Sequence, residues 1–315
     1  MQINTHNIKP KKGIQYNYAH PLAQGIVSNW AFNEGGGTVI YDIKNRSGTL
    51  GNFALAGSAT SGWVGSYFGG GLLFDGSNDY VTIGTFLQQH IDYNIPFSIS
   101  ICFTFYTFSG AGTYSLVAVT EANGAFFDQF ELNISANKVR AIFIQSPTGT
   151  NNGRIWDSTD TQGFEINKTY CITWTYDGLN TTTSTKFYKN GVPHAVTNTT
   201  NAGDIDRSLW TNAAFSVKDI WVGRRNYSTG DQPFPGVIDS LRVYNRVLGD
   251  DEIKTLYGNP YIDWISNRSI FRNPTLYGLG AWKGDLINAG ASGTLTADSV
   301  DNTVEAAMAL SFKKA

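Results

Sequence analysis

Two pairs of acidic residues are close enough along the chain to be tested for acid–base chemistry: Asp128 with Glu131, and Asp204 with Asp206. Hydrolysis of a glycosidic bond with retention of configuration needs two carboxyl groups about 5 Å apart, which two residues on one face of a strand provide. Asp128 and Glu131 are separated by three positions, so in a strand they point to opposite faces. Asp204 and Asp206 share a face, but the surrounding sequence predicts a loop without a third acid. The sequence therefore lacks the acid pair of a glycosidase.

Patterns for nucleophilic catalysis and for zinc binding are also missing. No Gly-x-Ser-x-Gly motif, which exposes a catalytic serine on a sharp strand-to-helix turn, occurs in the sequence. None of the histidines has a second His or Cys at the spacing of a zinc pair. They lie in predicted arms and turns, where we expect surface residues: His6, His20, His90 and His194. We therefore expect no catalytic residues and no enzymatic activity.

The clearest structural pattern is FPGVIDSLRVYNRVLGDDEIKTLY at residues 234–257. Its first half alternates with a period of two, which predicts a β-strand, and the bulk on both faces predicts a central position in a sheet. Gly249 and the three acidic residues after it predict a short helix in which Glu252 bonds the N-cap amide. A helix of about two turns is not stable alone. Its apolar residues, which we expect to pack on the sheet, are Ile253, Leu256 and Tyr257.

Short alternating runs recur upstream between turn residues. PFSISICFTFYTF at residues 96–108 predicts a strand with one apolar and one more polar face, and Asn190-Gly191 predicts a two-residue hairpin. Asp75-Gly76 is a similar hairpin or tight-turn signal, whereas SPTGTNNGRIWDSTDTQG at residues 146–163 is typical of a polar loop. Roughly a dozen strands and one terminal helix predict an all-β fold, a two-sheet antiparallel jelly-roll sandwich with extended terminal segments.

Composition and charge limit the partners. An aromatic content of 14%, 34 glycines and a charged content of 15% suit a β-rich chain with many turns. A net charge of −2 and a pI near 6.1 give no basic field for nucleic acid. No run of about 18 apolar residues could span a membrane, and no apolar run marks a secretory signal. We expect neither nucleic acid nor membrane as a partner.

The chain divides into three predicted parts. Residues 1–24 have no period and form an N-terminal arm, residues 25–259 form the jelly roll, and residues 260–315 form a C-terminal extension. We expect the extension to contact another subunit or a neighbouring protein; alternatively, its first half closes the edge of the domain itself. The aromatic residues behind this expectation are Tyr261, Trp264, Phe271 and Trp282.

Cys102 and Cys171 lie in the predicted strands ISICFTF and YCITWTY. Two interpretations are open. We favour two buried residues that act as small apolar side chains. The alternative is a disulfide between neighbouring strands, which depends on a geometry that the sequence does not reveal.

The segment at residues 234–257 resembles the closing segment of the concanavalin A-like lectin and glucanase superfamily, in the branch of laminin G-like and pentraxin-like jelly rolls. LLFDGSNDYV at residues 72–81 and the strands YCITWTYDG and TKFYKNGV are similar to motifs of the same family, so the resemblance covers about residues 25–257. It implies the jelly-roll fold and says little about the ligand. Glucanases of this superfamily carry acids at alternate positions of one strand, a run that this chain lacks.

The opening phrase YAHPLAQGIVSNWAFNEGGG at residues 18–37 resembles the start of laminin G-like domains encoded by tailed bacteriophages. This resemblance implies a non-enzymatic virion structural protein that decorates a capsid or is associated with a tail. It also implies a homo-oligomer with other virion proteins as partners, made in the host cytoplasm and located in the virion.

The family resemblance also implies a structural Ca²⁺ between the loop after the first strand and the last strand, because many members hold one there. Hard oxygen ligands suit this ion, and the candidate side chains are Glu34, Asp42 and Asp239. An Asx-turn is the alternative role for Asp42, and a buried acid bonded to backbone amides is the alternative for Asp239.

A sugar site would combine aromatic side chains, on which sugar rings stack, with polar hydrogen-bonding groups. Residues of these kinds in or beside the long loops are Trp156, Trp210, Arg224 and Tyr227. A carbohydrate-binding or adhesion module that recognises cell-surface glycans is therefore the alternative function, and packing at the rim of the sandwich is the alternative role for these four residues. An endoglycanase is a third reading, which the missing acid pair argues against.

Overall fold

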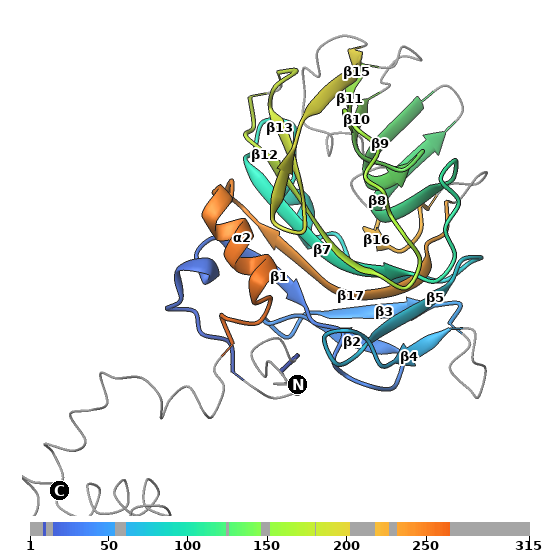
Figure 1. The fold of residues 1–315 in the computed structure, drawn as a ribbon, viewed down its shortest axis with the longest axis vertical. Coiled ribbons are helices and arrows are strands. Elements are labelled where there is room, and N and C mark those ends of the chain that lie inside the picture. The colour runs from blue at the N-terminus through green and yellow to red at the C-terminus, as the bar shows by residue number, and fades with distance from the viewer. Residues whose placement is uncertain are drawn as a thin grey trace, which may run out of the picture. The chain divides into compact units, whose positions relative to one another are not determined.

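The computed structural model of the chain describes residues 9–10, 15–53, 61–123, 126–145, 152–179, 181–201, 218–226 and 232–264. Almost all of its regular elements are strands, arranged in two sheets that face each other (Figure 1). The helical elements among the described residues are η2 (Pro21–Ala23), η3 (Phe86–His90) and α2 (Asp250–Gly258). No helix in these ranges is long and apolar enough to cross a membrane.

The first sheet has eight strands. They are β1 (Ile26–Trp30), β4 (Gly62–Val64), β5 (Gly71–Asp75), β7 (Phe97–Phe105), β12 (Thr169–Tyr176), β13 (Thr185–Lys189), β14 (Val192–His194) and β17 (Pro235–Tyr244). Their order is β14-β13-β12-β7-β17-β5-β4, and β1 also pairs with β17. Strand β17 thus pairs with β1, β5 and β7, which confirms the central position predicted from its sequence.

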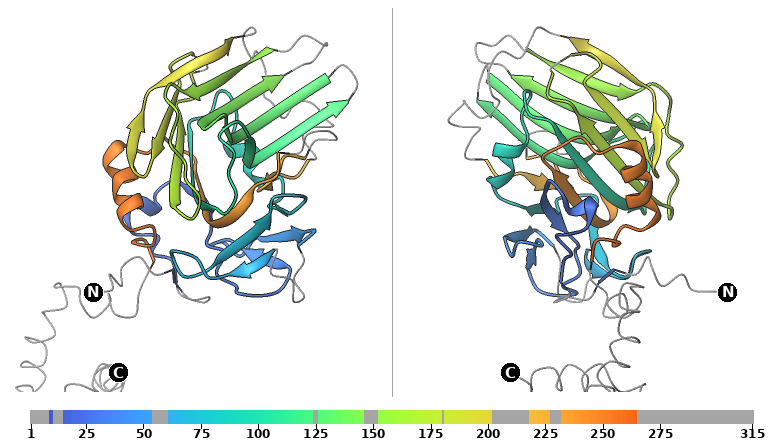
Figure 2. Two further views of the ribbon diagram at one scale, coloured as in Figure 1. Left: turned by 45° about the vertical axis from the view of Figure 1, so that its right-hand side comes forward. Right: turned by 90° about the vertical axis from the view of Figure 1, so that its left-hand side faces the viewer.

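The second sheet has nine strands. They are β2 (Val39–Tyr41), β3 (Ser47–Gly51), β6 (Tyr80–Thr82), β8 (Thr113–Asn123), β9 (Phe126–Ser135), β10 (Lys138–Gln145), β11 (Asn152–Ser158), β15 (Val196–Asn201) and β16 (Trp221–Val222). Their order is β15-β11-β10-β9-β8-β16-β6-β3-β2, and the strands in both sheets pair antiparallel. The predicted two-sheet antiparallel jelly roll is confirmed (Figure 2).

The core lies between the two sheets and is rich in aromatic rings. In β7 the predicted apolar face is fully buried: Phe97, Ile99, Ile101, Phe103 and Phe105. The opposite face of β7 is buried as well, because α2 and the turn before it cover this side. Ser98 on that face donates to the Arg246 carbonyl at 2.8 Å and accepts from the Leu248 amide at 3.0 Å.

Helix α2 begins as its sequence predicts. The Gly249 amide donates to Glu252 Oε2 at 2.9 Å, so the predicted cap is present. Ile253 and Leu256 are buried against the sheet, whereas Tyr257 is 40% exposed. Tyr257 lines the small cavity under the helix together with Cys102 and Cys171, so it packs on the sheet with only part of its side chain, because each residue turns the side chain about 100° around a helix and position 257 lies at the border of the contact.

The two predicted turns have different outcomes. Asn190 and Gly191 join β13 to β14 and both have positive φ, 53° and 77°, as a two-residue hairpin of this type requires. The Asp75 turn is also tight, since its carboxylate accepts from the amides of Ser77 at 2.7 Å and Asn78 at 3.2 Å. It joins β5 in one sheet to β6 in the other, so it is a crossing between sheets and not a hairpin.

The predicted loop at residues 146–163 contains a strand, β11, which is a correction to the sequence analysis. The segment NGRIWDS pairs with β10 on one side and β15 on the other. The turn-forming residues of this segment are typical of a loop, but its side chains alternate as in a strand. Trp156 points into the core and Asp157 points out. Pairing with neighbours on both sides outweighs the weak strand propensity of Asn, Gly and Asp.

Cys102 and Cys171 form a disulfide, so the interpretation that we favoured is wrong. They lie directly opposite each other on β7 and β12, with Cα atoms 4.0 Å apart. The sequence could not show this, because the pairing depends on the register between two strands separated by 69 residues.

The described residues near both termini pack on the sandwich. Tyr16 forms a β-bridge with Trp264, and its hydroxyl donates to Asp263 Oδ2 at 2.5 Å. The same carboxylate oxygen accepts from Arg242 Nη1 of β17 at 2.6 Å. Tyr261 is buried beside Phe68 and the disulfide, so packing continues past residue 259. Phe271 and Trp282 lie outside the described residues.

Candidate functional site

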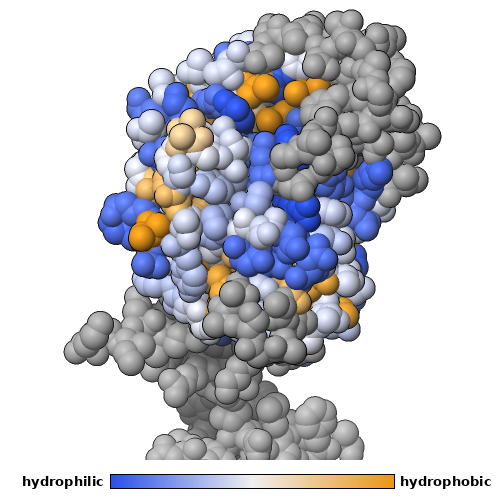
Figure 3. All heavy atoms as spheres, turned by 90° about the vertical axis from the view of Figure 1, so that its right-hand side faces the viewer, coloured by the Kyte–Doolittle hydropathy of each residue, from blue (hydrophilic) through white to orange (hydrophobic). Residues whose placement is uncertain are grey.

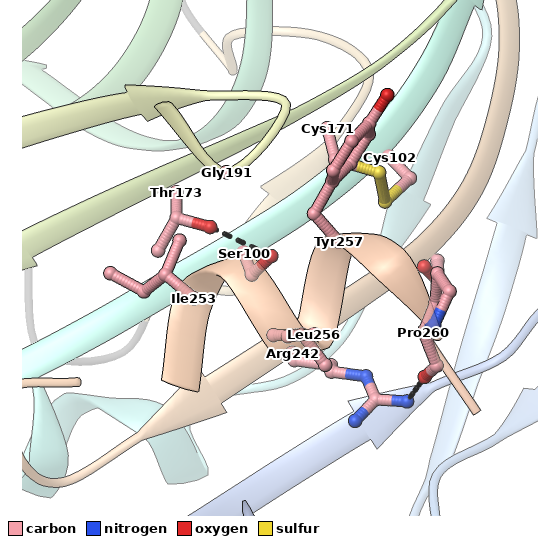
Figure 4. Close-up of a pocket in the computed structure, with 11 residues that line it drawn as sticks. Ser100, Cys102, Cys171, Thr173, Gly191, Arg242, Ile253, Leu256, Tyr257 and Pro260 are labelled. Carbon is pink, nitrogen blue, oxygen red and sulfur yellow. Dashed lines mark hydrogen bonds between the residues drawn. A yellow bond between two sulfur atoms is a disulfide. The ribbon is translucent and has the colours of Figure 1, made fainter. Parts of the chain in front are cut away.

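The outer face of the eight-stranded sheet is closed by α2. Ile253 and Leu256 lie over Ser100 and Thr173, as Figure 4 shows. The cavity that remains under the helix is about 10 Å³, too small for a sugar ring. This face therefore has no room for a ligand beneath the helix, and the other sheet becomes the candidate.

The outer face of the nine-stranded sheet carries a group of polar side chains, which we call the polar face. On β9, Phe130, Leu132 and Ile134 point into the core, so the alternate residues point outward. The outward set on β8 and β9 is Ser115, Thr120, Gln129, Glu131 and Asn133, and each of these is at most 2% exposed. Figure 3 views the side on which β8, β9 and β16 lie, where hydrophilic residues predominate among those coloured. Buried polar side chains on the outer face of a sheet are unusual. Polar side chains are normally buried only where they are hydrogen-bonded, so hydrogen-bond partners are expected for this group.

Glu131 is the centre of this group. It lies opposite Ala118 of β8 and Ile142 of β10, and it accepts a short hydrogen bond from Gln129 Nε2. With its side-chain amide turned to satisfy both neighbours, Gln232 donates to Glu131 Oε1 at 3.0 Å and accepts from Arg225 Nη1 at 3.2 Å. The carboxylate is thus linked through an amide to a guanidinium.

The charge state of Glu131 is set by opposing effects. Complete burial raises its pKa above the ordinary glutamate value, because a carboxylate loses its hydration. The Arg225 charge and the nearby polar side chains of Asn133, Ser115 and Gln129 act against this rise. The polar network therefore offsets part of the cost of burying this carboxyl group.

An aromatic pair lies beside this network on the same face. Trp221 of β16 lies opposite Ala118 of β8, so it shares the outward face with Glu131. The rings of Trp221 and Tyr80 are stacked, with centroids 3.8 Å apart and planes 8° apart, and both side chains are half-buried. The Arg224 guanidinium lies 6.0 Å from the Trp221 ring centre and donates to the Asn78 carbonyl at 3.1 Å. Carboxylate, guanidinium, amides and aromatic rings are thus brought together.

The other acid of the polar face is already paired. Asp157 of β11 accepts from Arg140 Nε at 2.6 Å and from Nη2 at 2.9 Å. This bidentate ion pair occupies both carboxylate oxygens. Asp204 and Asp206 lie outside the described residues, as does the side chain of Asp128. The described side chains of this face thus include Glu131 and Asp157, with partners that do not resemble a catalytic acid pair.

The residues predicted to bind glycan have three different outcomes. Trp156 is fully buried in the core, where its Nε1 donates to the Thr182 carbonyl at 3.1 Å. Its predicted place beside an exposed loop is wrong, because the surrounding segment is strand β11. Arg224 lies beside Trp221 on the candidate face. Trp210 and Tyr227 lie outside the described residues.

Two of the three predicted calcium ligands are engaged by protein groups. Asp42 Oδ1 accepts from the amides of Lys44 and Arg46 at 2.9 Å, and Oδ2 accepts from Arg46 Nε at 2.8 Å, so the alternative Asx-turn role is present. Glu34 Oε1 accepts from the Tyr41 amide at 2.8 Å. Asp239 is fully buried in β17. Among the side chains that the structure describes, no three of His, Cys, Asp and Glu group closely enough to hold a metal ion.

Trp221, Tyr80 and the role of Glu131 were not predicted from the sequence. A signal for Trp221 was present, because it alternates with the apolar residues Ile220 and Val222 and must face the opposite side. No comparable signal existed for the network around Glu131. Its members Arg225 and Gln232 are about a hundred residues away in the chain.

Comparison with one solved structure supports the fold. The chain is similar to a Trypanosoma rangeli sialidase in complex with sialic acid, with 17% sequence identity and a TM-score of 0.51 over 77% of this chain and 34% of that chain. It is also similar to domain 4 of AbnA, a GH43 extracellular arabinanase from Geobacillus stearothermophilus in complex with arabinotriose, with 16% identity and a TM-score of 0.49 over 74% of this chain and 98% of that chain. The chain spans about a third of the sialidase's length, and identities this low show the fold alone.

Comparison with curated proteins gives no match. The family model of the concanavalin A-like lectin/glucanases superfamily matches residues 75–254, from the end of β5 into α2. This range is more than half of the chain and contains the β8, β9 and β16 strands of the polar face. The chain therefore belongs to the concanavalin A-like lectin/glucanase superfamily.

Proposed function

We propose that this protein is a non-enzymatic carbohydrate-binding protein that holds a glycan at the polar face of the nine-stranded sheet. One observation carries the proposal: the half-buried side chains of Gln232 and Arg225, which form a hydrogen-bonded network with the buried Glu131, lie beside the half-buried, stacked rings of Trp221 and Tyr80. Sugar hydroxyls need paired donors and acceptors, and the C–H face of a sugar packs on an aromatic ring. Membership of a superfamily that includes lectins supports the same reading.

The test is binding to a glycan array in the presence of calcium, followed by calorimetry on the best ligand. Removing the ring with Trp221→Ala should weaken binding about two- to tenfold, because the loss of one stacking contact is worth about 0.5–1.5 kcal/mol. Tyr67→Ala is the matched control, since Tyr67 is an aromatic residue 74% exposed and lies in the loop before β5. Circular dichroism of each variant checks that the fold is intact.

Two results would refute the proposal. If the native protein binds no glycan on the array, the proposed function is wrong. Binding that Trp221→Ala leaves unchanged would place the glycan elsewhere on the molecule.

We further propose that the protein is a structural component of a phage virion, on the capsid or the tail, where it forms homo-oligomers. The specific support is the opening phrase at residues 18–37, which resembles phage-encoded laminin G-like domains. The packing of Tyr16 on Trp264 adds a physical reason, because both ends of the domain leave it at one place and could anchor it to a particle. Glycan binding and a virion role are compatible.

Mass spectrometry of purified virions tests this second proposal. The protein should be present in a fixed copy number relative to the major capsid or tail protein. Virions that contain none of it would exclude the structural role and leave the glycan-binding proposal untouched.

A further inference from the structure

A lysine near the N-terminus is buried against the first sheet. Lys9 is 7% exposed, and its backbone amide donates to the Phe68 carbonyl at 2.7 Å. The next residue, Pro10, accepts a hydrogen bond from Asn33 Nδ2 at 2.7 Å. These contacts fix the segment between the loop before β5 and the loop after β1.

The ammonium group of Lys9 meets oxygen atoms from two separate elements. Its Nζ donates to the carbonyl oxygen of Asp239 in β17 at 2.6 Å and also to the carbonyl oxygen of Gly70 before β5. The side chain of Asp239 is fully buried, and neither of its carboxylate oxygens has a hydrogen-bond partner of normal geometry. Glu34 Oε2 is buried without a partner as well. We call the carbonyl oxygens of Gly70 and Asp239, together with the Asp239 carboxylate, the oxygen cradle.

The charges in this cradle depend on one another. Burial lowers the pKa of Lys9 to about 8, while the negative charges of Asp239 and Glu34 act to raise it. Burial raises the pKa of Asp239 to about 6, while the positive charge of Lys9 acts to lower it. The opposite charges of the two groups thus offset part of the desolvation of each.

These residues fit an ammonium better than the calcium ion that the family resemblance implies. Calcium takes six to eight oxygen ligands at about 2.3–2.6 Å. Of the three side chains expected to bind it, Asp42 is engaged by Arg46 and by backbone amides. The two carbonyl oxygens that close the cradle already accept hydrogen bonds from Lys9.

We propose that the Lys9 ammonium is the resident cation of the oxygen cradle and takes the place of a metal ion there, so that the native chain needs no calcium for its stability. The cradle is a latent divalent-cation site that the chain itself occupies. Removing the ammonium leaves two carbonyl oxygens and a buried carboxylate without a cation, and an added cation can then enter.

The test compares the full-length native chain with Lys9→Met, which keeps the length of the side chain but removes its charge. The matched control is Lys168→Met, because Lys168 is an exposed lysine in a surface ion pair with Glu165. A double variant, Lys9→Met with Asp239→Asn, removes the cradle carboxylate as well. Urea denaturation is measured for each protein with EDTA and with 5 mM Ca²⁺, and calorimetry measures Ca²⁺ binding to the native chain.

We expect Lys9→Met to lower the folding equilibrium constant by about tenfold or more, because two buried carbonyl oxygens lose a charged hydrogen-bond donor. Calcium should recover part of this loss in Lys9→Met, and it should recover none in the double variant. The native chain and Lys168→Met should show the same midpoint with and without calcium.

Three results would overturn the proposal. Calcium that binds and stabilises the native chain would show that the ion, and not Lys9, is resident. Native-like stability of Lys9→Met would show that the ammonium does not hold the cradle. A loss of stability in Lys9→Met that calcium does not change would show a packing defect in place of an emptied cation site. By contrast, a Lys9→Met chain that folds only with calcium would support the proposal.

Discussion

The Cys102–Cys171 disulfide should contribute a large share of the stability of this domain. The two residues are separated by 69 positions, so the bond closes a loop of about 70 residues in the unfolded chain. In the loop-entropy description, a loop of this length lowers the unfolded-state entropy by about 15 cal/mol/K, which is about 4 kcal/mol at 25 °C. Folded domains are stable by only about 5–15 kcal/mol, so the loss would be easily measured.

Reduction and substitution provide two independent perturbations of this bond. Cys102→Ala with Cys171→Ala should lower the free energy of unfolding by about 3–4 kcal/mol, and dithiothreitol should produce a similar loss in the native chain. Dithiothreitol should have no effect on the double variant, which is the control. Urea denaturation followed by tryptophan fluorescence is a suitable assay, because Trp30, Trp156 and Trp174 are all fully buried.

A thiol titration tests whether the Cys102–Cys171 disulfide is present. Unfolded, non-reduced protein should show no free thiols. Two free thiols per chain would mean that the cysteines are the buried apolar pair favoured by the sequence analysis. An intact bond whose removal changes the free energy of unfolding by less than about 1 kcal/mol would instead refute the loop-entropy argument for this domain.

Two further predictions concern ion pairs near the C-terminal end of β17. Arg242→Met should cost about 3–5 kcal/mol because it leaves the fully buried Asp263 carboxylate without its cation, and adding Asp263→Leu should restore part of the loss in urea denaturation. The Arg246 guanidinium lowers the pKa of Glu252, so the pair stabilises the folded state above the unfolded-state pKa of glutamate and loses this contribution as the pH falls through the folded-state pKa. Glu252→Gln should therefore cost about 0.5–1 kcal/mol at pH 7, with the difference from native protein vanishing near pH 3; a constant difference across this pH range would contradict the assignment.

Patterns within one segment predicted much of the fold correctly. The alternation in β7 and β17, the Asn190-Gly191 hairpin and the Glu252 cap depend on residues within about ten positions of each other. Their physics is local, since side-chain period, positive φ and the first helical amides are properties of a short stretch.

Other parts of the fold and the candidate site could not be read from such patterns. Strand β11 has a loop-like composition and forms because β10 and β15 pair with it on both sides. Trp156 was therefore misplaced at the surface, while the half-buried Trp221 was overlooked.

The sequence by itself determined that this chain is an all-β jelly roll with a capped terminal helix and without a recognisable catalytic motif. Only the tertiary structure decided that Cys171 lies opposite Cys102, that Gln232 joins Arg225 to Glu131, and that Lys9 meets Asp239 across 230 positions of the chain. The reason is that hydrogen bonds and charge pairs act over a few ångströms in space. The register and crossing of strands, which no single segment encodes, decide which distant residues come within that range.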